Sequence, residues 1–432
     1  MSDPASTDAP ARMKALLYSR FGELRGPLFA VFVVVAFALF LDTVGLAGFA
    51  QAWEQAVLLI AGCMGIALMK PFRAPGTRST GVILVLIGVA LVLLRTVQMI
   101  NAVGEERQPS IDIGTTTIAA VDAYAEGRNP YTEPLDPVGQ LVDPEGQGLR
   151  YFGGYKYGPL MTVSYLPAVR AWGAQGLFLM NWLALIATAV AAAFWASAGA
   201  GRLAAAGAAA LVLVPRFLDP ELFTSGVTDL VPVALGMTAF ALGARQRDVP
   251  AGAMVGLSIA TKLMPGVLFA VALLAGAKDR GRMAVAMLVA AIVPHIPFLI
   301  DSPRELLSNL VIFNLARPFA DPSPLQGVTP GLARSISFGC AILAVVLLPL
   351  MVERGRLRDV RLVAATVALG LAIFLFGSKA FNRNYLLWVL PAAATAVATK
   401  VWATDPREDM LRRRAVSALS GREGDEPSST AG

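Results

Sequence analysis

Asp112 is a carboxylate in this chain that is a candidate for a general base. It lies in the segment SIDIG (110–114), shortly beyond an apolar run that ends near residue 100. A carboxylate so placed could lie over a cavity in a helix bundle and take the proton from an attacking hydroxyl group. A loop aspartate is more often solvated or a helix cap, so Asp122, Asp219 and Asp229 remain alternatives for this role.

A second group of residues is basic and flanks apolar runs. Ionisable side chains at membrane depth are costly and usually face a cavity, an ion path or an anionic ligand, whereas basic residues at a helix end can simply extend to the interface. A phosphate group would suit this set. Lys262, Lys379 and Arg383 are the stronger candidates for a phosphate contact. The whole set is Arg95, Arg216, Lys262, Arg304, Arg317, Arg334, Lys379 and Arg383.

The elements that must position these residues are membrane helices. The 432-residue chain is 56% hydrophobic and 15% charged, with a mean hydropathy of +0.62, which is unlike a soluble globular protein. Apolar runs of about twenty residues are long enough to span a bilayer as helices. The net charge of +6 is then explained by basic residues in cytoplasmic loops, and it does not indicate a nucleic-acid-binding surface. Cys63 and Cys340 lie in apolar runs and no metal-ligand spacing occurs, so the sequence predicts no disulfide framework, metal or cofactor.

Apolar runs separated by turn residues predict an all-α bundle of about twelve membrane segments. We expect residues 1–26 to be a cytoplasmic tail, residues 27–402 to be the transmembrane domain and residues 403–432 to be a disordered cytoplasmic tail. The predicted segments are residues 27–49, 53–70, 80–100, 174–199, 203–217, 228–244, 249–261, 264–277, 283–300, 331–352, 359–377 and 383–402.

The distribution of basic residues predicts the orientation. Lys and Arg accumulate in cytoplasmic loops, and here they cluster in every second connection, which places those connections and both termini in the cytoplasm. Between residues 249 and 277 this alternation holds only if the apolar run is broken. Proline disfavours helix in the residue before it. The segment TKLMP (261–265) therefore predicts a re-entrant hairpin that opens at Lys262 to the outer side.

Two long connections then lie on the outer side of the membrane. Residues 101–173 carry more acidic than basic side chains and include Asp112. Residues 301–331 contain Pro303, Pro318, Pro322 and Pro324, so we expect this connection to be irregular rather than helical throughout. Because Asp112 lies in one of these connections, we expect the active site to be on the outer face of the membrane.

Four short motifs follow one another between about residues 80 and 401. Asp112 precedes a stretch that ends in GRNPY (127–131), and YKYGPL (155–160) comes next with LP (166–167) behind it. TKLMP (261–265) follows, and the last motif is NYLLW (384–388) with Pro391. In this order they resemble the GT-C superfamily of glycosyltransferases, in particular glycosyltransferase family 87, the polyprenyl-phosphomannose-dependent mannosyltransferases. Ile113 departs from the family, which often has an aromatic residue there.

This resemblance implies inverting transfer of a sugar, most commonly mannose in the family, from a polyprenyl phosphate to a lipid or glycan acceptor. The reaction would occur on the outer face of the cell membrane, in contact with membrane lipids and without nucleic acid. By the same likeness Asp112 is the catalytic base and Lys262 contacts the donor phosphate. The implied substrate-binding set is Lys262, Lys379, Arg383, Tyr385, Arg95, Lys156 and Tyr157.

Two other functions fit part of the sequence. A transporter or flippase of a lipid-linked or anionic substrate also uses broken helices and buried charges. A non-catalytic scaffold for cell-envelope assembly would leave Asp112 replaceable. The chain shows no repeated halves and its intramembrane charges gather on one side, which favours the transferase over the transporter.

Overall fold

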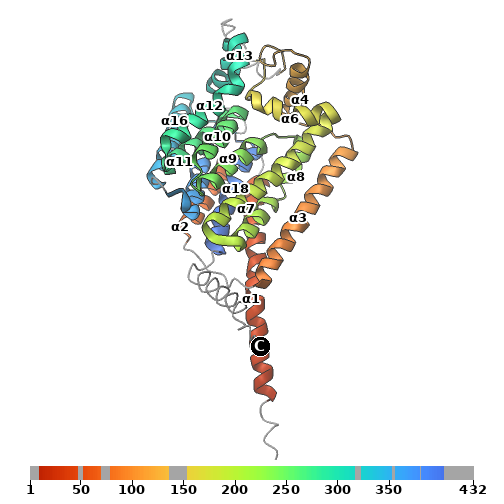
Figure 1. Cartoon of the computed structure of the whole chain (residues 1–432), viewed down its shortest axis with the longest axis vertical. Coiled ribbons are helices and arrows are strands. Elements are labelled where there is room, and N and C mark those ends of the chain that lie inside the picture. The colour runs from red at the N-terminus through yellow and green to blue at the C-terminus, as the bar shows by residue number, and fades with distance from the viewer. Residues whose placement is uncertain are drawn as a thin grey trace, which may run out of the picture.

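The described part of the chain is a bundle of helices. The computed structural model describes residues 9–46, 52–69, 78–135, 153–316, 323–352, 356–379 and 381–402. All regular secondary structure in these ranges is helical (Figure 1), which confirms the predicted all-α fold. The predicted tail at residues 403–432 lies outside the described residues.

Within these ranges, five helices are long and apolar enough to cross a membrane by length and composition. They are Gly26–Val44, Ser79–Gly104, Ala174–Leu213, Arg280–Asp301 and Pro330–Met351. Shorter apolar helices cover Glu54–Leu68, Leu230–Gly243, Leu263–Gly276 and Val360–Phe376. These helices correspond to segments expected from the apolar runs, so the chain is a multi-pass membrane protein.

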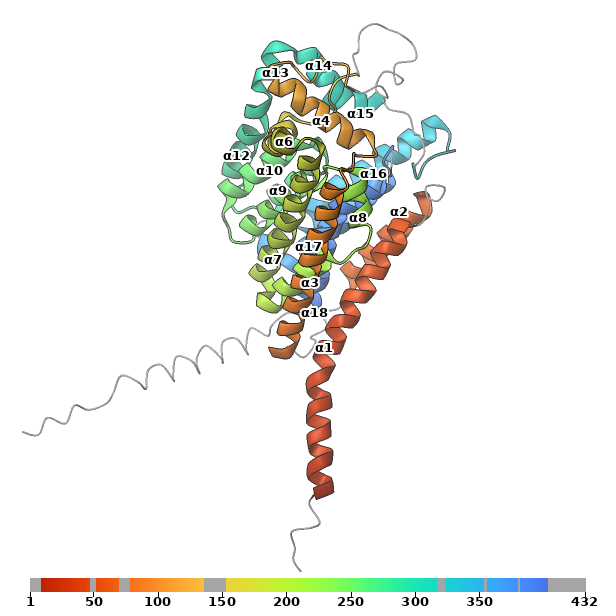
Figure 2. The ribbon, with the colours of Figure 1, turned by 90° about the vertical axis from the view of Figure 1, so that its right-hand side faces the viewer.

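Helix α1 (Ala9–Leu46) begins within the predicted tail, and its first turns extend away from the bundle (Figure 2). It then packs against α2 (Ala52–Leu68) and α3 (Arg78–Gly104). One face of α1 is buried, and Leu28, Phe32, Val35 and Leu39 are exposed. Exposed apolar side chains along one helix face are expected where the neighbour is lipid.

Helices α4 (Asp112–Ala125) and α6 (Pro159–Trp172) lie at the end of the bundle opposite the first turns of α1 (Figures 1 and 2). Both come from the long connection expected on the outer side. Helix α6 was not among the predicted segments. It ends at Gly173, whose φ of 58° favours glycine, and α7 starts at the next residue.

Helix α7 (Ala174–Leu213) unites the segments predicted at residues 174–199 and 203–217. A kink at Gly201, with φ 85° and ψ −173°, marks the break between them. The chain then turns through α8 (Leu218–Pro220) and the π-helical turn η3 (Glu221–Ser225) into α9 (Leu230–Gly243). Helix α9 packs against α7.

Helices α10 (Asp248–Thr261) and α11 (Leu263–Gly276) are separated at the predicted break. Lys262 between them is extended, with φ −149° and ψ 119°, and Met264 is also non-helical. Each helix has 14 residues, about 21 Å of axial length, which is shorter than the roughly 30 Å hydrocarbon core. Two short limbs that meet at a buried lysine are the hairpin that the sequence predicts.

The second long connection is more helical than predicted. After α12 (Arg280–Ile292) come η4 (Val293–His295), α13 (Ile296–Asp301), α14 (Pro303–Leu307), η5 (Ser308–Ile312) and α15 (Phe313–Ala316). The expectation of irregular structure was therefore wrong for residues 303–316. Pro303 stands in the first turn of α14, where a proline lacks no intrahelical hydrogen bond. Pro318 and Pro322 lie outside the described residues.

The last helices close the bundle. They are α16 (Pro330–Met351), η6 (Arg356–Arg358), α17 (Val360–Phe376), η7 (Arg383–Tyr385) and α18 (Leu386–Val401). Helix α18 is buried along its whole length and packs against α7, α9 and α17. It is the central helix of the core, and its first turn faces the junction of α10 and α11 through Trp388 and Tyr385.

Candidate active site

A buried ion pair forms the centre of the candidate site. The Nζ atom of Lys262 lies 2.6 Å from Oδ1 of Asp229, which is the residue before α9. Asp229 is fully buried and Lys262 is 9% exposed. Asp229 also accepts hydrogen bonds from Trp388 Nε1 at 2.5 Å and from Asn384 Nδ2 at 2.8 Å. With three donors on one carboxylate, Asp229 is engaged as the counterion of Lys262 and is a poor candidate for a general base.

Aromatic rings surround the ammonium group of Lys262. Its Nζ atom lies 4.9 Å from the centre of the Tyr157 ring, 5.3 Å from Trp388 and 5.6 Å from Tyr385. A cation at these distances is attracted by the ring faces. Three predicted residues are thus brought together: Lys262 at the helix break, Tyr157 in a loop and Tyr385 at the start of α18.

The loop at residues 153–158 docks on the end of α10 and so places Tyr157. The backbone N–H of Gly158 donates to the carbonyl of Thr261 at 2.9 Å. A Cβ atom on Gly158 would overlap the carbonyl oxygen of Ala260, so only glycine allows this approach. From the other side, the hydroxyl of Tyr131 donates to the carbonyl of Tyr157 at 2.8 Å.

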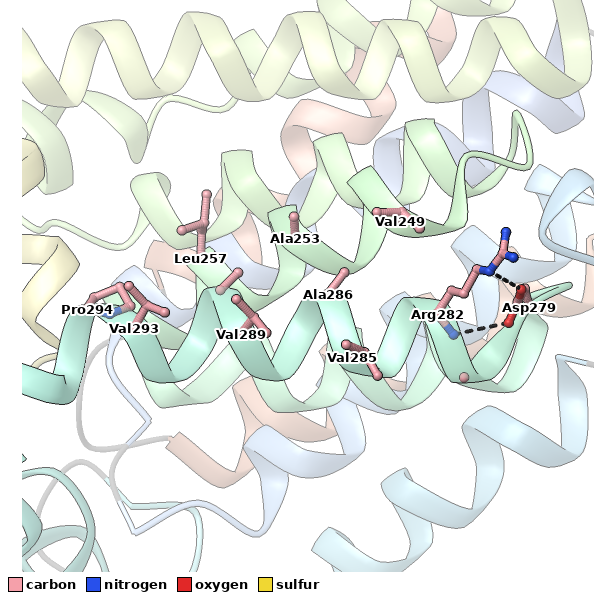
Figure 3. A pocket seen from close by; sticks show the side chains of 12 residues that line it. Val249, Ala253, Leu257, Asp279, Arg282, Val285, Ala286, Val289, Val293 and Pro294 are labelled. Carbon is pink, nitrogen blue, oxygen red and sulfur yellow. Dashed lines mark hydrogen bonds and ion pairs between the residues drawn. The ribbon is translucent and has the colours of Figure 1, made fainter.

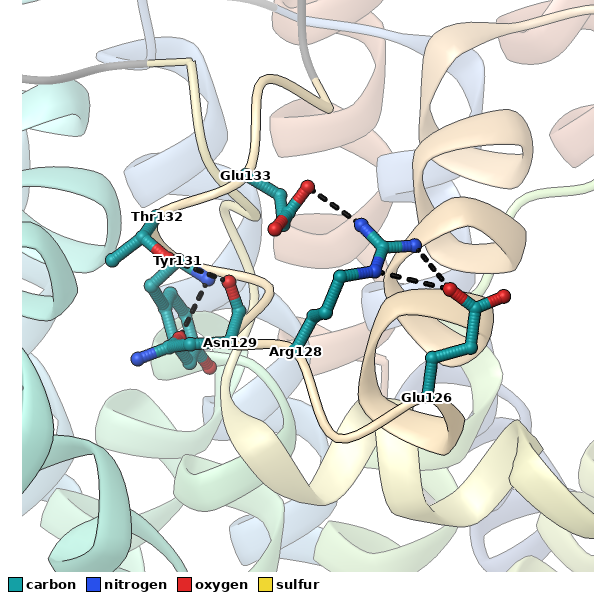
Figure 4. Close-up of polar contacts among 6 residues, drawn as sticks. All are labelled: Glu126, Arg128, Asn129, Tyr131, Thr132 and Glu133. Carbon is teal, nitrogen blue, oxygen red and sulfur yellow. Dashed lines mark hydrogen bonds and ion pairs between the residues drawn. The ribbon is translucent and has the colours of Figure 1, made fainter.

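The turn after α4 explains the motif GRNPY (Figure 4). Gly127 has φ 76°, which favours glycine. Arg128 then pairs with Glu126 at 2.7 Å and with Glu133 at 2.6 Å, and the side chain of Asn129 accepts from the backbone N–H of Tyr131 at 2.9 Å. The motif is a support that holds the buried Tyr131 beneath the loop of Tyr157.

Asp112 is the first residue of α4 and is exposed. Its Oδ1 accepts the backbone N–H of Ile113 at 2.9 Å. Burial raises the pKa of Tyr157 well above its usual range, and the neighbouring Asp229, Tyr385 and Asp112 raise it further. Tyr157 is thus near enough to both carboxylates for their charges to raise its pKa.

A second charge pair lies beside the first. Arg383 Nε is 3.7 Å from Oε1 of Glu221, the first residue of η3. Arg383 directly precedes Asn384, which holds Asp229. Burial raises the pKa of Glu221 to about 7, the Arg383 guanidinium lowers it and the Asp229 carboxylate raises it. Two cations and two carboxylates therefore share this region.

Three other predicted residues are held elsewhere. Arg95 donates to the carbonyls of Leu213 at 2.9 Å and Pro215 at 2.6 Å, where α7 ends, so its guanidinium stabilises the scaffold. Lys379 donates to the carbonyl of Leu315 at 2.5 Å. Lys156 donates to Asn309 at 2.7 Å. These contacts tie connections together and do not bring Arg95, Lys379 or Lys156 into the pair of Lys262.

Within the described residues, no hydrogen bond or ion pair links the remaining candidates to Lys262. Arg216, beside Asp219, has its backbone N–H bound by the side chain of Asp42 at 2.7 Å. Asp122 lies half-buried on α4. Arg317 is outside the described residues. The sequence interpretation missed Glu221 and Trp388. An acidic residue in a short break between two apolar runs was a usable signal for Glu221. Trp388 lies in the motif NYLLW (384–388), but its sequence neighbours do not show that it binds Asp229.

Two cavities flank α10 and α12. The smaller one, about 260 Å³, is beside the site and is lined mainly by apolar residues, among them Ile259, Leu263, Leu306 and Leu310, with Gly158 at its edge. The larger one, about 890 Å³, is a groove between α10 and α12 that is mainly apolar, with Asp279 and Arg282 at one end (Figure 3). It holds none of the residues around Lys262, so volume alone does not locate the chemistry.

Comparison with known proteins gives the same fold. The crystal structure of ArnT from Cupriavidus metallidurans bound to undecaprenyl phosphate matches with a TM-score of 0.52 and 17% identity, over 77% of this chain and 63% of ArnT. The apo structure of ArnT matches with a TM-score of 0.49 and 16% identity, over the same shares. This chain thus spans less than two thirds of the length of ArnT. No curated protein matches the chain.

The likeness to ArnT confirms the predicted GT-C-like arrangement of helices. The sequence profile of glycosyltransferase family 87 matches residues 155–378. That range is just over half of the chain and contains Tyr157, Glu221, Asp229 and Lys262. The chain therefore belongs to glycosyltransferase family 87.

Proposed function

We propose that this protein transfers a sugar from a polyprenyl-phosphate donor to a hydroxyl group of an acceptor. The observation that carries the proposal is the buried ammonium of Lys262. A lysine offers three donors, and among the described residues Nζ donates only to Asp229. The group is thus charged, held in place by a carboxylate and three rings, and still able to bind a phosphate oxygen.

The cavity beside Lys262 supports a lipid-linked donor. Its walls are almost entirely apolar and reach Leu263, the neighbour of Lys262. A phosphate bound at Lys262 would leave its hydrocarbon chain next to these walls. ArnT, which has the same fold, was crystallised with undecaprenyl phosphate, and we infer a carrier of that chemical class for this protein.

In the proposed reaction the acceptor oxygen attacks the anomeric carbon of the donor sugar. A new C–O bond forms with inversion, the bond from the anomeric carbon to the phosphate oxygen breaks, and polyprenyl phosphate leaves. Asp112 accepts the proton of the attacking hydroxyl. It is exposed and forms no ion pair with another described residue. Lys262 stabilises the negative charge that grows on the leaving phosphate.

We further propose that the site faces away from the cytoplasm and that both termini are cytoplasmic. The alternation of basic residues supports this orientation. It fits the arrangement in Figure 2, where the first turns of α1 lie at the end of the bundle opposite α4 and α6. By the resemblance to the family, mannose is the proposed sugar and a lipid or glycan is the proposed acceptor.

The test is sugar transfer from radiolabelled polyprenyl-phosphomannose by the purified protein, wild type beside Asp112→Asn. Loss of a general base costs about 10²- to 10⁴-fold in rate. Asp122→Asn, on the same helix, is the matched control and should transfer sugar at the wild-type rate. If Asp112→Asn transfers as fast as the wild type, the base lies elsewhere. Transfer from no such donor would reject the proposed activity.

A further inference from the structure

Glu221 is a buried carboxylate whose hydrogen-bonding capacity the surrounding protein leaves unused. The residue is 8% exposed. Its ion-pair partner is Arg383, and the 3.7 Å between Nε and Oε1 is longer than a hydrogen bond. No residue in the described part of the chain donates a hydrogen bond to this carboxylate. Burying a charged group without such donors is unfavourable, so Glu221 suits a ligand that brings donors.

The position of Glu221 connects the two halves of the proposed site. Arg383 precedes Asn384, which donates to Asp229, the counterion of Lys262. On its other side, η3 contacts the segment that leads into α4. The backbone N–H of Ser110 donates to the carbonyl of Thr224 at 3.1 Å, two residues before Asp112. Glu221 is therefore connected to Lys262 through Arg383, Asn384 and Asp229, and its own element, η3, contacts the segment before Asp112.

The chemistry of the proposed donor indicates which of its groups meets Glu221. The transferred sugar is bonded directly to the phosphate, so its ring must lie beside whatever binds that phosphate. Hydroxyl groups of the ring are hydrogen-bond donors, and an ionised carboxylate is acceptor-only. The phosphate is an acceptor and would meet Arg383 and Lys262 instead. Cations for the phosphate and a carboxylate for the sugar thus stand side by side.

We propose that Glu221 is a substrate-binding residue that accepts hydrogen bonds from hydroxyl groups of the transferred sugar. This inference rests on the proposed polyprenyl-phosphate donor. The groups that face Glu221 are Arg383, on η7, and Asp229, before α9. Burial raises the pKa of Glu221 to about 7, which agrees with a carboxylate that lacks donors until substrate arrives.

A structural role makes a different prediction. If Glu221 serves only to hold Arg383, its replacement disturbs the phosphate contact, and lipids with and without a sugar lose the same affinity. If Glu221 binds the sugar, only the sugar-bearing lipid loses affinity. The ratio of the two dissociation constants separates these roles and requires no turnover.

The experiment measures equilibrium binding of two radiolabelled lipids, polyprenyl phosphate and polyprenyl-phosphomannose, to the full chain in lipid nanodiscs. Glu221→Gln keeps the shape of the side chain and removes its charge. We expect the affinity for polyprenyl-phosphomannose to fall at least about 10-fold, since hydrogen bonds to charged groups are the stronger ones. Binding of polyprenyl phosphate stays within about twofold and shows that the variant is folded. Glu106→Gln, an exposed residue just after α3, leaves both affinities unchanged.

The sugar contact would be overturned if Glu221→Gln left the ratio of the two dissociation constants unchanged, whether both affinities stay the same or both fall equally. If the wild type binds neither lipid, the polyprenyl-phosphate donor itself is wrong and the role of Glu221 falls with it. Selective failure at Glu221 and failure of the proposed donor therefore give different results.

Discussion

Replacing Lys262 by methionine removes one charge of the buried pair and leaves the other. At 2.6 Å, two unit charges attract by about 6 kcal/mol in an effective dielectric of about 20, and the cost of desolvating both groups offsets much of this. Breaking such a pair typically costs about 3 to 5 kcal/mol, because one charge stays buried without its partner. Trp388 and Asn384 still donate to Asp229 in this variant, so we expect the lower end of that range.

The double variant Lys262→Met with Asp229→Asn tests the reasoning. Since both charges are then absent, it should be less destabilised than the sum of the single variants by about 2 to 4 kcal/mol. The assay is equilibrium unfolding of the four proteins in mixed dodecyl maltoside and SDS micelles, followed by tryptophan fluorescence. Single-variant losses that simply add would show that the two groups do not interact, and the account of Lys262 as a carboxylate-held cation would be refuted.

Three further predictions concern other parts of the site and its support. Gly158→Ala should lower transfer at least about 10-fold by lifting the loop from Ala260, whereas Gly88→Ala, where a Cβ meets nothing within 4 Å, should leave transfer unchanged. Because burial raises the pKa of Glu221 to about 7, its charge is lost as the pH falls through about 7. The affinity for polyprenyl-phosphomannose should therefore fall at acidic pH in the wild type, and a titration of Glu221→Gln should lack this step. Arg95→Met should destabilise the fold by about 1 to 3 kcal/mol through unpaired carbonyls, with the KM for donor unchanged in the folded protein; a raised KM would instead support the predicted binding role.

Local signals explain why the break at Lys262 could be predicted. Pro265 and the alternation of basic residues act within a few turns of the chain, and the structure has the two helices separated there. The glycine of the motif GRNPY likewise adopts a positive φ just after the end of α4. Glycine and proline constrain the backbone wherever they occur, so their effects are visible in sequence.

Partners across the fold could not be predicted in this way. Asp229 lies 33 positions from Lys262 along the chain, and Trp388 lies 159 positions from Asp229. The sequence placed Asp229 among candidate bases because a carboxylate near an apolar run gave no indication of which cation would face it. Only the packing of α9, α10 and α18 makes it a counterion. Helix α6 was missed because Pro159, Pro167 and Arg170 interrupt its apolar run.

Buried and partly buried cations in this protein are accommodated in two physically different ways, and the difference separates scaffold from site. Arg95 and Lys400 donate to backbone carbonyls at the ends of α7 and α2, where carbonyls lack intrahelical donors and the helix dipole favours positive charge. Such a cation supplies the hydrogen bonds that the carbonyls at the helix end lack, and it is part of the folded scaffold. Lys262 and Arg383 instead face carboxylates, which balance their charge. Among the described residues, no backbone carbonyl accepts a hydrogen bond from either cation. A negatively charged phosphate can compete for the N–H groups of Lys262 and Arg383, whereas it could not displace a helix end without breaking the fold. The kind of acceptor, rather than burial or charge alone, therefore identifies Lys262 and Arg383 as the cations suited to a ligand.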